Sequence, residues 1–586
     1  MRRAFRFRLR ILAGGVVLIA LFLILRLYFV QIVHGETYAL MGEHQYVSSS
    51  QQLFDRGSIY FTTKDGTLVS AAALVNGFLI AIDPETLKDP EGTYQKISAL
   101  VPGIDHDAYE KSVAKKDDPY EIIAHHVSDD AGRAVDALDI PGVQVERERW
   151  REYPAGADAA QTLGIIAYDN DNTIAGRLGL ERYYDYTLTR TGEGVFGNFF
   201  AELFANLDNV VKDPRDVTQG DVITSIEPMV QQKLDEQLAA VEAQYHSTVS
   251  GGIVMDPKTG AILALDTNPS FDPNDFQNAD PDHFGNPLVE SRYEFGSIFK
   301  MLTMTSGLDA GVIQPDTTYD DTGCIEVNKS RICNYDLKAR GVIPMQQILS
   351  QSLNVGASFI ATRLGHDRMR MYFTNLGLGT ETGIDLPNEI HGDIQNLNSP
   401  RDVEYDTASF GQGIATTPVE TIRALGSLAN NGAIVTPHVA TAIRLESGIV
   451  KNLSWGDPKQ VFSPQAVAET TNMLINVVDI NLGNGTVKIP TTSVAAKTGT
   501  AQIAGPDGKY IPGNVYFHSF FGYFPAHDPK FAILLFTREP QNVEYASETL
   551  TAPFMNLTHF LINYYDIPPD RGVPAAQTST DDSTTQ

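Results

Sequence analysis

The 586-residue chain is poor in basic residues: 44 Lys and Arg stand against 72 Asp and Glu, which gives a net charge of −28 at pH 7. Proteins that bind nucleic acid neutralise phosphates with a basic surface, so this balance argues against a nucleic-acid partner. The excess of acid favours solubility and does not by itself indicate a fold.

Cysteine is almost absent, with only Cys324 and Cys333 in the chain. The two lack the paired spacing of a structural zinc site, and none of the 13 histidines stands in an H-E-x-x-H motif. We therefore expect no metal and no cofactor. Short apolar runs on either side of Asn328-Lys329-Ser330 predict a β-hairpin between the cysteines. Such a pair can form a disulfide in an oxidising compartment, and the alternative is two free thiols.

The N-terminus carries an apolar stretch that we interpret as a membrane anchor. Residues 11–33 are mostly apolar and contain one charged residue, Arg26, and a cluster of arginines precedes them. About 20 apolar residues are enough to cross a bilayer. No small-x-small cleavage site follows, which disfavours a cleaved signal peptide. We expect residues 1–10 to form a cytoplasmic tail, residues 11–33 a single-pass helix in the cytoplasmic membrane, and the bulk of the chain to lie outside it.

Ser297 and Lys300 form an S-x-x-K motif, followed by a run that predicts a helix. Residues three apart share one face of a helix, so the two side chains are expected to meet. A serine hydroxyl needs a base to accept its proton. Lysine can act as that base if burial and a second cation keep it neutral. The motif therefore supplies a candidate nucleophile and base.

The S-x-x-K motif alone does not identify a catalytic site, since it also occurs at Ser112 and Lys115 in a charged segment. Two further motifs single out Ser297 and Lys300. An S-x-N follows at residues 352–354, and a K-T-G at residues 497–499. Another K-T-G, at residues 258–260, precedes the serine, and its neighbouring proline predicts a turn.

The ordered triple resembles the signature of active-site-serine penicillin-binding proteins and β-lactamases. Further segments resemble the class B penicillin-binding proteins in particular: Arg56-Gly57 and residues 151–154, 163–164, 176–181, 377–387 and 408–418. The resemblance implies an α+β multidomain fold. An extended, mostly β non-catalytic pedestal is expected at residues 34–245. A transpeptidase domain like that of serine β-lactamases, with a central antiparallel sheet flanked by helices, is expected at residues 246–566. Residues 567–586 have the composition of a disordered tail.

The resemblance also implies roles for the motif residues. Ser297 would attack a D-alanyl-D-alanine stem peptide, and Lys300 would accept its proton. Ser352 would relay a proton to the leaving amine, while Asn354 would hold Lys300 and the substrate amide. Lys497 would place a positive charge near the substrate carboxylate and help to keep Lys300 neutral.

The residues around the K-T-G motif would bind the substrate. Thr498, Gly499 and Thr500 are the expected binding residues, and the hydroxyls of Thr498 and Thr500 would contact the terminal carboxylate. The backbone N–H groups of Ser297 and Thr500 would form the oxyanion hole.

Beside the serine, the chain departs from the family pattern. Phe295 and Ile298 stand where the family usually has proline and threonine. Since both flank the reactive atoms, we expect them to tune the site and its sensitivity to β-lactams.

Charged residues in the N-terminal boxes are interpreted as structural. Arg56 is expected to form an ion pair or cap a backbone group. Glu181 is expected to pair with Arg151 or Arg177, because no second acid is spaced to work with it in catalysis.

The implied activity is that of a serine-type peptidoglycan D,D-transpeptidase, an acyltransferase that cross-links stem peptides through an acyl-enzyme and binds penicillin covalently. The implied partners are stem peptides, β-lactam antibiotics, the cytoplasmic membrane and a membrane-embedded glycan polymerase. A D,D-carboxypeptidase or a β-lactamase would use the same triple, and a β-lactam receptor is a third alternative. The anchor and the long N-terminal module favour the transpeptidase and disfavour a glycosyltransferase domain. Division and elongation both stay open as its role.

Overall fold

The structure is a computed structural model that describes residues 55–168, 174–190, 219–505, 509–513 and 515–572. The chain divides into two compact units, one containing Leu74–Trp150 and the other Arg56–Ala73 with the described part of Arg151–Gln586. The expected cytoplasmic tail, the anchor at residues 11–33 and most of the expected C-terminal tail lie outside the described residues. Within the described ranges, no helix is both long enough and apolar enough to cross a membrane.

The smaller unit packs helices against a sheet. Its helices are α3 (Pro90–Leu100), α4 (His106–Ala114) and α5 (Asp129–Asp136), and its strands are parts of β3 (Leu68–Ile82) and β5 (Val143–Glu152) with β4 (Glu121–Val127). β3 pairs with both β4 and β5. In the chain, β4 lies between α4 and α5. Lys115 of the second S-x-x-K forms an exposed ion pair with Glu121.

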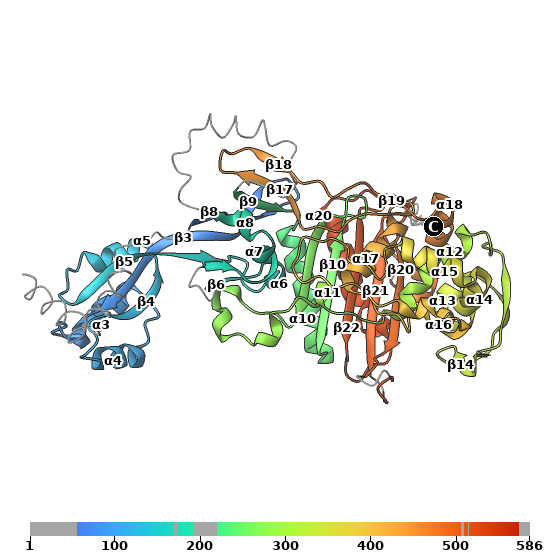
Figure 1. The fold of residues 1–586 in the computed structure, drawn as a ribbon, viewed down its shortest axis with the longest axis horizontal. Coiled ribbons are helices and arrows are strands. Elements are labelled where there is room, and N and C mark those ends of the chain that lie inside the picture. The colour runs from blue at the N-terminus through green and yellow to red at the C-terminus, as the bar shows by residue number, and fades with distance from the viewer. Residues whose placement is uncertain (1–54, 169–173, 191–218, 506–508, 514, 573–586) are drawn as a thin grey trace, which may run out of the picture. The chain divides into compact units, whose positions relative to one another are not determined.

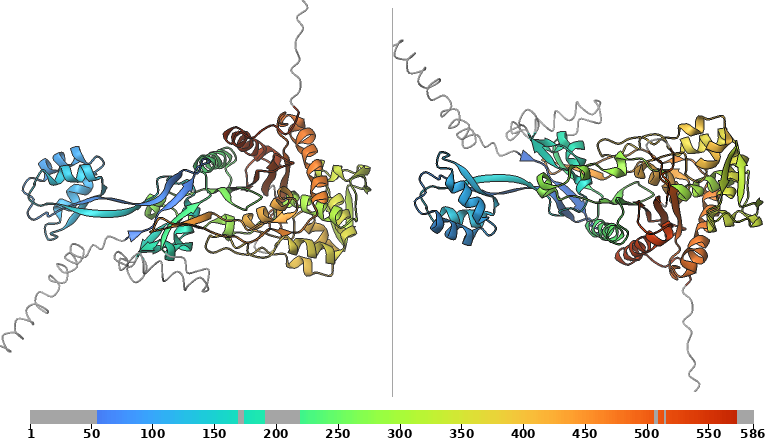
Figure 2. Two further views of the ribbon diagram at one scale, coloured as in Figure 1. Left: turned by 90° about the horizontal axis from the view of Figure 1, so that it is seen from above. Right: turned by 90° about the horizontal axis from the view of Figure 1, so that it is seen from below.

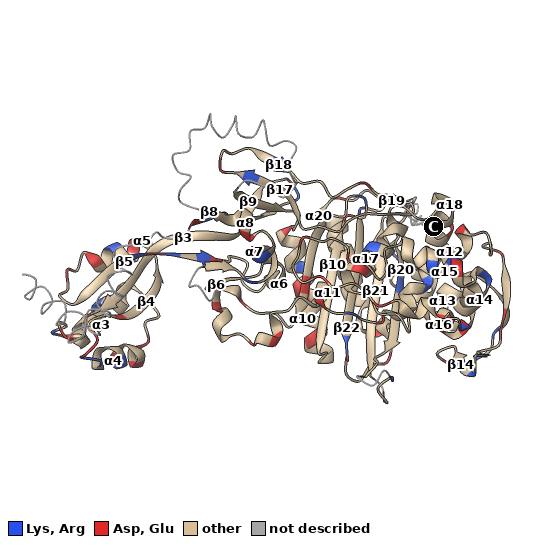
Figure 3. Cartoon of the chain, in the orientation of Figure 1, with Lys and Arg blue, Asp and Glu red and all other residues tan. Residues whose placement is uncertain are grey.

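A five-stranded antiparallel sheet forms the centre of the larger unit. In spatial order its strands are β11 (Ile262–Asn268), β10 (Val249–Met255), β22 (Phe531–Arg538), β21 (Tyr516–Phe524) and β20 (Ala495–Gln502). In Figure 1 the green strand β10 lies beside the red strand β22, so the sheet joins segments far apart in sequence. The strands β10, β21 and β22 are almost wholly tan in Figure 3, because they contain hardly any charged residue.

Helices cover both faces of this sheet, as the two further views show (Figure 2). Successive strand residues point to opposite faces. Val254 and Leu535 belong to the core shared with α10 (Pro228–Tyr245) and α20 (Thr551–Tyr564). Their neighbours Ile253 and Leu534 belong to the core shared with α12 (Lys300–Asp309), α14 (Asn354–Leu364), α17 (Pro418–Gly426) and α18 (Pro464–Asn476). α10 begins at Pro228, and proline suits the first turn of a helix. Residues 258–260 form the predicted turn, which connects β10 and β11.

A second sheet belongs partly to the larger unit. There its strands are β18 (Val450–Asn452), β17 (Ala440–Leu445), β9 (Gly220–Thr224), β2 (Ile59–Thr62) and the beginning of β3. Further elements of the larger unit lie near the three sequence motifs. They are α13 (Gln346–Ser350), α15 (His366–Asn375), α16 (Asp402–Ala408), β12 (Thr318–Asp321), β13 (Cys324–Val327), β14 (Ser330–Cys333) and β15 (Gly341–Pro344).

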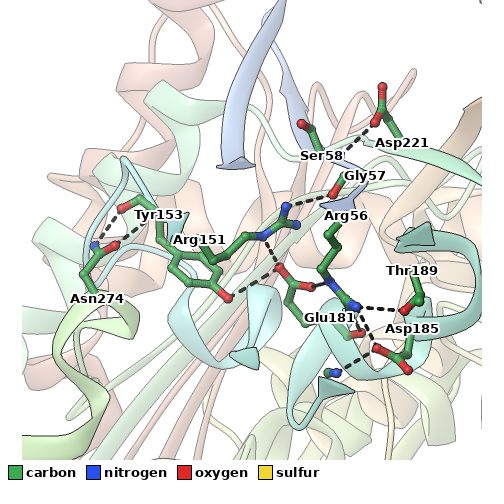
Figure 4. Close-up of polar contacts among 11 residues, drawn as sticks. Arg56, Gly57, Ser58, Arg151, Tyr153, Glu181, Asp185, Thr189, Asp221 and Asn274 are labelled. Carbon is green, nitrogen blue, oxygen red and sulfur yellow. Dashed lines mark hydrogen bonds and ion pairs between the residues drawn. The ribbon is translucent and has the colours of Figure 1, made fainter. Parts of the chain in front are cut away.

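Glu181 is the centre of a buried ionic network (Figure 4). Its side chain, on α7 (Gly179–Tyr183), is 0% exposed and accepts from Arg56 Nε at 2.6 Å and from Arg151 Nε at 2.7 Å. Arg56 also pairs with Asp185 at 2.8 Å. The structural roles predicted for Arg56 and Glu181 are therefore confirmed. Of the two alternatives for Glu181, Arg151 is the partner, whereas Arg177 donates to the Tyr168 carbonyl instead.

Replacing Glu181 with alanine is expected to lower the free energy of unfolding of the larger unit by about 3–5 kcal/mol. The substitution would leave two buried guanidinium groups without their shared carboxylate. Denaturant unfolding measured by circular dichroism tests this. Glu236→Ala is the control, since Glu236 pairs with Lys233 on the surface and its loss is expected to cost about 1 kcal/mol or less. Equal losses in the two variants would contradict the role given to Glu181.

Candidate active site

Ser297 lies in a short 3₁₀ turn, η4 (Gly296–Phe299), that leads directly into α12. Lys300 is the first residue of α12, and its Nζ lies 3.0 Å from Ser297 Oγ. Gly296 has a φ of +63°, and a Cβ there would lie 2.9 Å from the Thr500 carbonyl oxygen. Glycine therefore allows η4 to approach strand β20 closely.

Ser352 and Asn354 reach the same point from the junction of α13 and α14. Lys300 Nζ donates to the Ser352 carbonyl at 2.6 Å and to Asn354 Oδ1 at 2.7 Å. Ser352 has a φ of +55°, which is uncommon for a residue other than glycine. Of the S-x-N motif only Asn354 lies on a helix, because α14 begins there.

Lys497 completes the cluster from β20. Its Nζ donates to Ser352 Oγ at 3.0 Å and to the Thr498 carbonyl at 2.8 Å. Ser352 Oγ also lies 3.3 Å from Lys300 Nζ, so this one hydroxyl contacts both lysines. The structure thus brings together all five residues that were predicted to be catalytic.

The charge states of the two lysines follow from their burial. Lys300 is 1% and Lys497 3% exposed. Burial, with a further contribution from Lys497, holds the pKa of Lys300 well below its usual range. Burial lowers the pKa of Lys497 to about 7. Since two ammonium groups beside one hydroxyl repel each other, the pair favours a single positive charge, and Lys300 is the lysine that lies beside Ser297 Oγ and is placed to act as a neutral base.

The hydrogen bonds of Lys300 suit a base. A neutral amine has two N–H donors and one lone pair. The Ser352 carbonyl and Asn354 Oδ1 can only accept, so they take both donors. The lone pair is then left for a hydroxyl proton, and Ser297 Oγ, at 3.0 Å, is the nearer of the two hydroxyls beside the amine, the other being Ser352 Oγ at 3.3 Å.

The motif residues open onto a cavity of about 540 Å³. Ser297, Ser352, Asn354, Lys497, Thr498 and Thr500 line it. So do residues for which the sequence suggested no role in the site: Tyr335, Gln412, Glu544 and Tyr545, together with Phe410. Phe410 and Gln412 stand in the segment 408–418 that resembles the family, so that segment was an available signal, whereas nothing local marks Tyr335 or Glu544.

Gly499 does not belong to the cavity wall, which corrects its expected place among the binding residues. A Cβ at this position would lie 2.3 Å from Ser519 Oγ and 2.5 Å from the Phe295 carbonyl oxygen. Its glycine allows β20 to pack against the chain that precedes the nucleophile.

Phe295 and Ile298, which were predicted to tune the site, lie behind the nucleophile. Both are 0% exposed, and neither lines the cavity. Phe295 packs edge-on against Phe517, with ring centroids 5.2 Å apart. These side chains fill the core behind the nucleophile and do not restrict access to it.

Two backbone N–H groups fit the expected oxyanion hole. Ser297 lies in the first turn of η4, where N–H groups have no partner within the helix. Thr500 lies on β20, the edge strand, which has a row of backbone groups without a ladder partner. Both residues line the cavity.

Comparisons with known proteins agree with this site. The family model "Penicillin binding protein transpeptidase domain" matches residues 251–558, and "Penicillin-binding Protein dimerisation domain" matches residues 54–194. Stage V sporulation protein D of Bacillus subtilis is 29% identical over 92% of this chain and 82% of its own length. Peptidoglycan D,D-transpeptidase FtsI of Escherichia coli is 24% identical over 93% of this chain and 90% of its own length.

Solved structures show the same fold. Penicillin-binding protein 3 of Mycobacterium tuberculosis, in complex with aztreonam, is 26% identical with a TM-score of 0.63, over 73% of this chain and 93% of that structure. Penicillin-binding protein 2X of Streptococcus thermophilus is 21% identical with a TM-score of 0.68, over 88% of this chain and 79% of that structure.

Because the transpeptidase model covers more than half of its length, the chain belongs to the penicillin-binding protein transpeptidase family. The dimerisation domain ahead of it makes this a class B member, with a pedestal followed by a transpeptidase domain. Its activity is that of a serine D,D-transpeptidase of cell-wall synthesis.

Replacing Lys497 with methionine is expected to shift the acid limb of the acylation rate against pH to higher pH. Without the second cation the pKa of Lys300 would rise, so a higher pH would be needed to produce the neutral amine that acts as the base. Acylation by a labelled β-lactam, followed over a range of pH, measures the shift. Lys258→Met, in the other K-T-G, is the control and should leave the limb in place. An unmoved limb in Lys497→Met would contradict the proposed coupling.

Proposed function

We propose that this transpeptidase cross-links peptidoglycan through an acyl-enzyme on Ser297. Neutral Lys300 accepts the hydroxyl proton as Ser297 Oγ attacks the carbonyl of the penultimate D-alanine. The N–H groups of Ser297 and Thr500 stabilise the oxyanion that forms, a contribution worth about 100–1000-fold per donor. The observation that carries this proposal is the 3.0 Å separation of Lys300 Nζ from Ser297 Oγ, with the Ser352 carbonyl and Asn354 Oδ1 accepting from the same amine.

Proton transfer to the leaving group is assigned to Ser352. Its hydroxyl lies 3.3 Å from Lys300 Nζ and 3.0 Å from Lys497 Nζ, so it can pass a proton from Lys300 to the departing amine. D-Alanine leaves, and an amine of a neighbouring stem peptide attacks the acyl-enzyme. The new amide bond is the cross-link.

Lys497, Thr498 and Thr500 bind the terminal carboxylate of the donor peptide. Lys497 supplies a buried cation, and the two threonines line the cavity beside it. β-Lactams imitate this end of the substrate, so they would acylate the same serine. The buried positions of Phe295 and Ile298 support entry of the drug, because neither side chain reaches the cavity.

Hydrolysis of the acyl-enzyme, as in a carboxypeptidase, is the alternative fate of the same intermediate. Comparing the lifetime of the acyl-enzyme in water with its lifetime in the presence of an amine acceptor separates the two reactions.

The chain is also proposed to be held in the cytoplasmic membrane by residues 11–33, with its catalytic domain outside the cell. The apolar stretch, its preceding arginines and the absence of a cleavage site support this. A membrane-embedded glycan polymerase is the corresponding partner, because cross-linking requires freshly made strands nearby.

Ser297→Ala is expected to abolish covalent labelling by penicillin, because Ser297 is the proposed nucleophile, with its Oγ 3.0 Å from Lys300 Nζ and facing the cavity. Mass spectrometry of the labelled chain locates the modified residue. Ser112→Ala is the matched control: it removes the serine of the other S-x-x-K and should label at the rate of the unchanged chain. Labelling of Ser297→Ala at that same rate would show that the nucleophile is wrongly assigned.

Deleting residues 1–33 is expected to release the chain from membranes, since it removes the proposed anchor. Sedimentation of membranes after a high-salt wash measures the release. Deletion of residues 573–586 is the control and should leave the chain in the membrane fraction. A full-length chain whose mature N-terminus falls between residues 30 and 47 would instead identify a cleaved signal peptide.

A further inference from the structure

The hairpin formed by β13 and β14 lies directly behind the S-x-N motif. Its strands pair with Cys324 opposite Cys333, and a disulfide joins the two cysteines. The two-residue loop, Asn328 and Lys329, has positive φ at both positions, as in the tight turns that suit hairpins. The predicted hairpin and disulfide are therefore confirmed.

The base of this hairpin contacts a residue of the active site. The Cys333 carbonyl accepts from Asn354 Nδ2 at 2.9 Å, while Asn354 Oδ1 accepts from Lys300 Nζ at 2.7 Å. A side-chain amide has a donor end and an acceptor end. A carbonyl on one side requires the NH₂ group there, so the Cys333 carbonyl determines that Asn354 presents its oxygen to Lys300.

The residues after Cys333 extend the same support. Asn334 is 1% exposed, and its Oδ1 accepts from the Val355 N–H in the first turn of α14 at 3.2 Å. Tyr335 lines the cavity, and its ring lies 6.0 Å from that of Tyr545 on the neighbouring segment. Three consecutive residues thus orient Asn354, hold the start of α14 and form part of the cavity wall.

The inner face of the hairpin is packed. At its base, Asn334 donates to the Gly323 carbonyl at 2.9 Å and to Asp321 Oδ1 at 2.8 Å, and the disulfide joins the two strands covalently. Ile332 is buried against Ala357, Val403 and Phe410, and the loop residue Asn328 accepts from the Val403 N–H at 3.0 Å. These contacts hold the loop and the middle. At the base, where Cys333 meets Asn354, the disulfide is the covalent tie between the two strands.

We propose that the Cys324–Cys333 disulfide positions the catalytic machinery, by holding the Cys333 carbonyl against Asn354 and thereby fixing how Asn354 binds Lys300. Cys333 and its disulfide partner are positioning residues, since neither cysteine lines the cavity. The proposal rests on the function assigned to Ser297 and Lys300 above.

Sensitivity to thiols follows from this role. A dithiol reductant would transfer two electrons to the disulfide, break the bond between the two Sγ atoms and add a proton to each sulfur, while the reductant itself becomes a cyclic disulfide. The freed base of the hairpin would let the Asn354 amide rotate. Acylation would then slow without loss of the nucleophile.

Reduction of the folded, full-length chain is the first test. Treatment with dithiothreitol should lower the rate of acylation by labelled penicillin by roughly 10- to 100-fold, the scale of a displaced catalytic group, and reoxidation should restore it. Cys324→Ser/Cys333→Ser should show the low rate from the start and should not respond to reductant. Glu326→Gln, an exposed change on the same hairpin, should behave as the unchanged chain. An unaltered rate after complete reduction would overturn the proposal.

A double-mutant cycle separates positioning from general stability. If the disulfide acts through Asn354, adding Cys324→Ser/Cys333→Ser to Asn354→Ala should cost almost nothing further, because the group being positioned is already gone. Full additivity of the two losses would refute the proposal. Reduction should also move the acid limb of the acylation profile to lower pH, since the Lys300 ammonium loses an acceptor. A hairpin that merely stabilised the fold would leave that limb in place.

Hydrogen exchange gives a readout that does not depend on catalysis. Reduction should accelerate exchange at the start of α14, where Val355 bonds to Asn334, and leave α10 unchanged. If exchange responds but the oxidised chain never acylates, the function assigned to Ser297 fails while the coupling stands. If the oxidised chain acylates and neither rate nor exchange responds, the role of the disulfide is refuted.

Discussion

Two buried lysines that share one hydroxyl are the constraint around which the catalytic unit is arranged. Ser352 Oγ lies within hydrogen-bonding distance of both Lys300 and Lys497, and water is largely excluded from both amines. Two positive charges so close together in a buried site are unfavourable, so one lysine gives up its proton. That lysine, Lys300, is the one beside Ser297 Oγ. The positive charge that would bind a substrate carboxylate and the amine lone pair that would accept the Ser297 proton therefore both result from burying the two lysines side by side.

The packing around this cluster explains the glycines that flank it. Gly296 and Gly499 lie where the helix carrying the nucleophile meets strand β20, and a side chain at either position would collide with the opposite backbone. Because β20 is the edge strand, Thr500 can offer its free backbone side to the cavity. In another part of the larger unit, the buried carboxylate of Glu181 holds distant segments together. It forms ion pairs with Arg56 and Arg151, which are far apart in sequence.

Much of this arrangement could be predicted, for reasons that differ between residues. The helix from Pro228 to Tyr245 follows from its apolar spacing and its proline in the first turn, and the turn at residues 258–260 follows from its composition. The predicted partners of Glu181 included the correct arginine because Arg151 stands in another segment that resembles the class B proteins. Gly499 was assigned to substrate binding because its motif neighbours bind there. Its actual role depends on Ser519 and Phe295, which belong to other elements.

The sequence by itself determined the chemistry: the order of the three motifs identifies a serine, its base and a second cation, because these residue types are required for acyl transfer. Only the tertiary structure decided which lysine is neutral, since that depends on burial and on distances between α12, α13, α14 and β20. It also decided that Ser352 adopts a left-handed conformation and that Cys333 orients Asn354. A motif records which groups are present, whereas pKa values and the direction of an amide depend on neighbours that the fold brings from distant parts of the chain.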